Sequence, residues 1–205
     1  MSNWYIDFDS TLYDTSSLTK DMLETMALHI DKQNKENILN ELKSIFNREH
    51  IYNIFKLCDY FEKKYSLKSN FLLNSVKEVI SNGSKYVYED VIYFLNKLKE
   101  NNNTVQMLTF STTKENMEFQ ELKIHGSEIS NYFDTIIITA TPKHILDLKY
   151  ENGIFVDDNP EDLKNLYNVN GKRIIRIKRE NGKYSDKPLN ISKIEEYTTL
   201  SEILI

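Results

Sequence analysis

Short apolar runs recur along the chain, separated by longer amphipathic stretches. Most of these runs are continuous rather than alternating and are rich in Ile and Val, as is typical of strands covered on both faces in a parallel sheet. Runs of strand length span 4–8, 104–108, 135–139, 154–156 and 173–177. Helical patterns lie between them at 87–100, 114–124 and 160–167. Strands that alternate with helices predict an α/β fold with a Rossmann-like, doubly wound parallel sheet.

One long stretch, 16–82, departs from this alternation. It holds no strand-like run, and its apolar residues recur at helical spacing in four successive stripes, which include Met22, Ile38, Ile54 and Leu72. The sequence therefore predicts an α-helical insertion at 16–82 within an α/β core made of 1–15 and 83–205. Near the C-terminus, 182–188 is predicted to be a loop and 201–204 a short helix.

Composition excludes several classes of protein. The 205 residues carry a net charge of −5 with acids and bases mixed throughout, which marks no nucleic-acid or anionic-membrane surface. No apolar run approaches the length needed to cross a bilayer, and Asp7 arrives too early for a secretory leader. The single cysteine, Cys58, lies in a helical pattern and is expected in the core. We expect a soluble, cytoplasmic protein.

Carboxylate pairs follow two of the predicted strands. Asp7 and Asp9 lie two residues apart after the first strand, so both side chains leave an extended backbone on the same side. Asp157 and Asp158, with Asp162 one helical turn later, follow the fourth strand. An isolated Asp-x-Asp is common in surface turns, and Asp162 alone would be an ordinary acid at a helix N-terminus. Like charges held this close require either a shared proton or a bound cation.

Other polar residues follow the remaining strands. Thr109 ends the second run and Lys143 follows the third after a short link, and each taken alone reads as an ordinary strand-end or loop residue. In an open parallel sheet, however, ligands bind beyond the carboxyl ends of the strands. The sequence thus predicts one site that combines carboxylates, a hydroxyl and an ammonium. Hard oxygen ligands of this kind favour Mg²⁺.

The order of these motifs resembles the haloacid dehalogenase-like hydrolase superfamily. The resemblance covers the core portions of the chain, and the helical insertion matches in position and type what that family calls a type 1 cap. The stretches 108–110, 119–123 and 132–134 also look like the ordinary middle of such hydrolases. The motifs that carry the resemblance are Asp7-x-Asp9-x-Thr11, Thr109, Lys143 and Asp157-Asp158-x-x-x-Asp162.

The resemblance implies a role for each residue. Asp7 would be the nucleophile that forms an aspartyl-phosphate, and Asp9 the general acid for the leaving oxygen and later the base for water. Thr109 and Lys143 would hold the phosphoryl oxygens, with Ser10 as a further substrate-binding residue. Ser10 stands where the family often has glycine.

The resemblance also implies Mg²⁺ as the cofactor. Asp7 and Asp158 would bind it through their side chains and Asp9 through its backbone carbonyl. Asp157 and Asp162 would support the site through bound water or by orienting the direct ligands.

The resemblance narrows the function to a small set of alternatives. The family's dehalogenases lack a carboxylate where Asp9 stands, and its transport ATPases carry threonine there, so Asp9 favours a phosphatase. A helical cap excludes large substrates, which favours a small phosphorylated metabolite. A phosphomutase and a non-catalytic binding protein of the same fold are the alternatives. The stripes of the insertion fit packing within the chain and pairing with a second copy equally well, so the oligomeric state stays open.

Other candidate residues carry weaker expectations. The four histidines show no metal-ligand spacing, although His144 adjoins Lys143 and is a candidate to line the pocket. Phe110 would narrow that pocket. An aromatic side chain of the insertion region, Tyr13 or Tyr52, is expected to face the substrate.

Overall fold

Six parallel strands form a single sheet in the computed structural model, which describes residues 2–48, 53–148, 153–170 and 173–205. The spatial order is β3-β2-β1-β4-β5-β6, with every neighbouring pair parallel. The strands are β1 (Asn3–Ile6), β2 (Thr104–Phe110), β3 (Thr135–Thr139), β4 (Gly153–Asp157), β5 (Ile174–Ile177) and β6 (Glu195–Tyr197). The predicted α/β doubly wound fold is therefore confirmed. The order reverses direction at β1, between β2 and β4, where such sheets bind their ligands.

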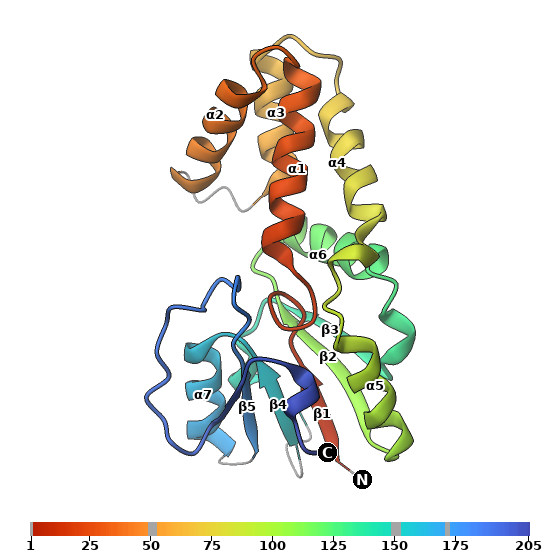
Figure 1. Ribbon diagram of the computed structural model, residues 1–205, viewed down its shortest axis with the longest axis vertical. Coiled ribbons are helices and arrows are strands. Elements are labelled where there is room, and N and C mark those ends of the chain that lie inside the picture. Colours follow the sequence, from red (N-terminus) through yellow and green to blue (C-terminus); the bar gives the residue numbers. More distant parts are fainter. Residues whose placement is uncertain (1, 49–52, 149–152, 171–172) are drawn as a thin grey trace.

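Helices cover the sheet on both faces, which explains the continuous apolar strands. They are α5 (Val91–Glu100), α6 (Lys114–Gly126) and α7 (Pro160–Asn170) (Figure 1). Successive residues of β1 point to opposite faces of the sheet and belong to two separate apolar clusters. Trp4 packs edge-on against Phe94 of α5 in one cluster, and Tyr5 stacks on Phe155 of β4 in the other. Because both faces of β1 are buried, the loop that follows it is held on a rigid strand.

Along the chain, four helices follow β1 before the next strand, β2, begins. In Figure 1 these helices lie above the sheet. They are α1 (Thr15–Ile30), α2 (Lys35–Arg48), α3 (Ile54–Lys64) and α4 (Phe71–Ser81). Asp14 caps the start of α1 by accepting a hydrogen bond from the Ser17 amide at 2.9 Å, as is usual for aspartate at this position. The division of the chain into a core and an insertion at 16–82 stays a prediction, and we call residues 15–81 the four-helix segment.

The four-helix segment is joined to the sheet by two adjacent stretches of chain. The Asp14 amide donates to the Tyr86 carbonyl at 2.7 Å, and the Tyr88 amide donates to the Leu12 carbonyl at 3.1 Å. A third contact joins α4 to α6, where a Cβ added at Gly126 would lie 2.0 Å from the Ile80 carbonyl oxygen. Only glycine permits this close approach, so α6 touches both the sheet and the four-helix segment.

The structure also differs from the sequence pattern in places. β1 ends at Ile6 rather than at residue 8, because the chain turns back at once: the amides of Leu12 and Tyr13 both donate to the Phe8 carbonyl. The predicted helix at 87–100 begins at Val91, and the short helix expected at 201–204 is a single 3-10 turn, Leu200–Glu202. The polar edge strand β6 was not predicted. Within the described parts of the chain, every helix is too short or too polar to traverse a membrane.

Candidate active site

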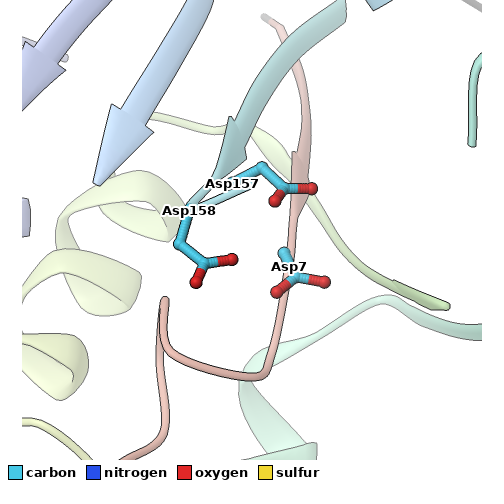
Figure 2. Close-up of side chains that lie close together, drawn as sticks. All are labelled: Asp7, Asp157 and Asp158. Carbon is cyan, nitrogen blue, oxygen red and sulfur yellow. The ribbon is translucent and has the colours of Figure 1, made fainter. Parts of the chain in front are cut away.

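Three carboxylates meet at the point where the strand order reverses. Asp7 directly follows β1, Asp157 ends β4 and Asp158 is the next residue (Figure 2). The Asp7 amide donates to the Val156 carbonyl at 2.8 Å, so the ladder between β1 and β4 fixes the backbone beneath the site. Each carboxylate offers an oxygen within 4.8 Å of the others, and all three residues are buried.

Lys143 lies against these carboxylates. It opens a 3-10 turn, Lys143–Ile145, after β3, and its Nζ donates to Asp7 Oδ1 and to Asp157 Oδ2, each at 2.6 Å. The residue is 4% exposed, so it is not the solvated loop lysine that its sequence neighbourhood alone suggests. A charged hydrogen bond of this kind is about twice as strong as a neutral one.

The charges of this group do not balance. Lys143 offers one positive charge against the three carboxylates of Asp7, Asp157 and Asp158. Burial raises the pKa of Asp7 to about 8 in spite of the neighbouring ammonium, and burial together with the other two carboxylates raises the pKa of Asp158 to about 9. A hard divalent cation such as Mg²⁺ would take the place of the protons that these raised pKa values imply, and the three carboxylates would hold it.

Asp9 points into a different environment although it lies two residues from Asp7. Its Oδ1 accepts a hydrogen bond from Thr15 Oγ1 at 2.5 Å and pairs with the Lys123 ammonium, and its Oδ2 accepts from Gln120 Nε2 at 2.8 Å. Burial acts to raise the pKa of Asp9, but Lys123 and these hydrogen bonds outweigh it and lower the pKa below its ordinary value. The two carboxylates are thus electrostatically distinct.

The remaining candidates occupy the edges of this site. Thr109, near the end of β2, is buried, and its Oγ1 accepts from Gln120 Nε2 at 2.9 Å, so one amide group links it to Asp9. Ser10 is buried in the loop after β1 with φ 59°, a left-handed conformation that favours the glycine usual in the resembling family. Asp162 lies in the first turn of α7, where it accepts from Asn159 Nδ2 at 3.0 Å and is not part of the three-carboxylate group.

Four residues of the site were not predicted. Thr15, Gln120 and Lys123 hold Asp9, and Arg176, fully buried in β5, donates to the Asp158 carbonyl at 3.4 Å. One signal was available in the sequence for α6, because Gln120 and Lys123 are three residues apart and occupy the buried face where an ordinary helix carries apolar residues.

The weaker expectations have mixed outcomes. Tyr13 does not face solvent or a substrate, because its ring is fully buried and stacks on Phe8 with centroids 4.8 Å apart. Tyr52 lies outside the described residues. Phe110 is 40% exposed at the end of β2, directly after Thr109.

No protein-family model matches the chain, and no curated protein matches its sequence. Solved structures do match. A HAD phosphatase from Thermococcus onnurineus is 19% identical with a TM-score of 0.65, and the match covers 98% of this chain and 95% of that one. The chain has the fold of the haloacid dehalogenase-like hydrolases.

Other matches of this fold differ in chemistry. A proposed β-phosphoglucomutase from Thermotoga maritima is 16% identical with a TM-score of 0.67, and the match covers 98% of this chain and 96% of that one. An L-2-haloacid dehalogenase from Xanthobacter autotrophicus is 13% identical with a TM-score of 0.58, over 98% and 96% of the two chains. The predicted fold is confirmed, and these similarities do not distinguish between the reactions.

Proposed function

We propose that this protein is a Mg²⁺-dependent phosphatase that hydrolyses a small-molecule phosphomonoester through an aspartyl-phosphate. The observation that carries the proposal is the contrast between Asp7 and Asp9. Asp7 lies with Lys143 and two further carboxylates, whereas Asp9 is held by three hydrogen-bond donors of its own. A cation held among the three carboxylates would keep Asp7 ionised, as a nucleophile must be, whereas the donors around Asp9 fix the carboxyl group that moves the proton.

The reaction takes place in two halves. Asp9 first takes up the proton that a monoanionic phosphomonoester carries, because its lowered pKa keeps it a carboxylate in the free protein. A carboxylate oxygen of Asp7 attacks phosphorus, the bond from phosphorus to the ester oxygen breaks, and that oxygen takes this proton from Asp9. The alcohol leaves and Asp7 carries the phosphoryl group. The carboxylate of Asp9 then accepts a proton from water as the water oxygen attacks phosphorus. Inorganic phosphate departs with that proton, and Asp7 and Asp9 are both carboxylates again.

Charge is the main obstacle to the first half, because a phosphoryl dianion must approach buried carboxylates. The Lys143 ammonium already contacts Asp7 and would offset charge on the phosphoryl oxygens, and Thr109 would donate its hydroxyl hydrogen to one of them. Mg²⁺ held by Asp7 and Asp158, the Asp9 carbonyl and the supporting carboxylates Asp157 and Asp162 would supply the rest of the positive charge.

The position of the four-helix segment supports a small substrate. Its first helix begins at Thr15, whose hydroxyl contacts Asp9, and its returning stretch pairs with the stretch that leaves the sheet. We propose that residues 16–82 act as a cap over the site, which would exclude phosphoproteins and nucleic acids and reduce water access. We further propose that the enzyme is soluble and cytoplasmic and acts on a small phosphorylated metabolite.

Asp9 separates this proposal from dehalogenation. A halide leaves without a proton, whereas the alkoxide of a phosphomonoester needs one, so a firmly held carboxylate at this place is useful to a phosphatase. A phosphomutase would use the same groups and return the phosphoryl group to a sugar rather than to water.

The decisive experiment is a phosphomonoester panel with p-nitrophenyl phosphate, ribose 5-phosphate, glucose 6-phosphate and glycerol 3-phosphate, assayed with Mg²⁺ and with EDTA. We expect Mg²⁺-dependent release of inorganic phosphate, with Asp7→Asn inactive and the exposed control Asp59→Asn fully active. An isomeric sugar phosphate in place of free phosphate would identify a mutase. Chloride release from 2-chloropropionate without phosphatase activity would identify a dehalogenase, and no turnover of any compound would favour a binding protein.

A further inference from the structure

Helix α6 directs two buried polar side chains at Asp9. Gln120 and Lys123 are one helical turn apart and therefore lie on the same face. Gln120 donates to Asp9 Oδ2 at 2.8 Å, and the Lys123 ammonium pairs with Asp9 Oδ1, so each carboxylate oxygen has a partner on this helix. Together they restrict rotation of the Asp9 carboxyl group about its side-chain bonds.

Burial of the Lys123 ammonium costs more free energy than a purely structural contact requires. It is 3% exposed, and its ammonium lies 5.7 Å from the ring centroid of Phe8 and 5.2 Å from that of Phe119. Burying an ammonium costs several kcal/mol, and an apolar side chain in such a place is often as stable or more stable. A methionine between these two rings would meet the needs of packing alone.

Gln120 adds a second constraint, because its Nε2 donates to Thr109 Oγ1 as well as to Asp9. Thr109 is the hydroxyl proposed to hold a phosphoryl oxygen, and Asp9 must reach the ester oxygen bonded to the same phosphorus. One amide group therefore sets the distance between the two groups that act on neighbouring oxygens. Such alignment matters, since small displacements of a reacting group lower rates strongly.

We infer that Gln120 and Lys123 are positioning residues that aim the acid–base carboxylate of Asp9 at the leaving oxygen. The inference rests on the proposed phosphatase function. Its consequence is specific to the leaving group. An alkoxide must be protonated as it departs, whereas p-nitrophenolate leaves readily without a proton. Loss of alignment therefore slows cleavage of alkyl phosphates and largely spares p-nitrophenyl phosphate.

The test compares Lys123→Met and Gln120→Leu with wild type and with Glu121→Met, a control on the exposed face of the same helix. The quantity measured is kcat/KM, which reports the steps up to departure of the leaving group, for p-nitrophenyl phosphate and for the alkyl phosphate that the panel ranks first. We expect Lys123→Met to lower kcat/KM about 10- to 100-fold for the alkyl ester and less than about 3-fold for the nitrophenyl ester. Glu121→Met should change neither.

Several outcomes would overturn the inference. If Lys123→Met lowers kcat/KM by the same factor for both esters, or for neither, the helix does not aim Asp9, and the phosphatase proposal still stands. Gln120→Leu keeps the Lys123 ion pair and is the second variant in case Lys123→Met does not fold. If thermal unfolding shows that both variants are unfolded, the contacts of Gln120 and Lys123 are structural and the inference fails. If wild type hydrolyses neither ester, the proposed function fails and the inference fails with it.

Discussion

The buried ion pair of Lys143 allows a quantitative prediction of stability. Lys143→Met removes the ammonium and keeps a side chain of similar length, which leaves Asp7 and Asp157 buried without their 2.6 Å partner. Breaking a buried pair by removing one member costs about 3–5 kcal/mol, because the remaining charge is uncompensated. For a chain of this size that corresponds to a fall in the melting temperature of roughly 6–20 °C.

An exposed lysine provides the control for this prediction. Lys63 pairs with Asp59 at 2.6 Å, the same distance, but the side chains are 74% and 62% exposed. Lys63→Met should therefore change the free energy of unfolding by less than about 0.5 kcal/mol. The assay is urea unfolding followed by circular dichroism in EDTA at one neutral pH. If Lys143→Met is as stable as Lys63→Met, burial does not govern the strength of this pair and the electrostatic account of the site is wrong.

Three further predictions follow from the same contacts. Asp158→Ala should weaken Mg²⁺ activation more than Asp157→Ala or Asp162→Ala, and an Mg²⁺ titration in which Asp157→Ala is the most damaged would shift the proposed direct ligand by one residue. Burial raises the pKa of Asp7 to about 8 and of Asp158 to about 9, so the folded metal-free protein keeps protons that the unfolded chain has released. Its free energy of unfolding should therefore fall as the pH rises from about 5 to about 8, and calorimetry should show that Mg²⁺ removes this fall. Glu62→Ala should cost about 1–3 kcal/mol in urea unfolding, because the buried Glu62 carboxylate accepts three backbone amides at the start of α4, and no loss would mean that water replaces it.

The parts of the fold that the sequence predicts well are those with strong periodicity. The Ile- and Val-rich runs predict β1 to β5, because strands covered on both faces carry apolar residues at successive rather than alternate positions. β6 was missed for the opposite reason: Glu195 and Glu196 make it polar, and only its pairing beside β5 makes it a strand. The predicted ends of helices are wrong where backbone contacts decide them. Helix α5 begins only at Val91 because the residues before it return from the four-helix segment, and the Tyr88 amide donates to the Leu12 carbonyl.

The candidate site divides in the same way. Asp7, Asp157 and Lys143 follow strand ends, so their order along the chain predicts that they meet at one edge of a parallel sheet. Gln120 and Lys123 lie mid-helix, and no local pattern states which neighbour a buried polar residue will face. Only the packing of α6 against the loop after β1 brings them to Asp9.

The most direct test of the covalent mechanism is the turnover of Asp7→Asn on the best ester of the panel with Mg²⁺. The substitution is nearly isosteric and removes the nucleophile, so the account predicts an unchanged fold and a barrier higher by about 6 kcal/mol or more, a loss of at least roughly four orders of magnitude in kcat. Asp59→Asn, measured beside it, should retain full activity. Appreciable turnover by Asp7→Asn, in a preparation free of wild-type enzyme, would contradict the account.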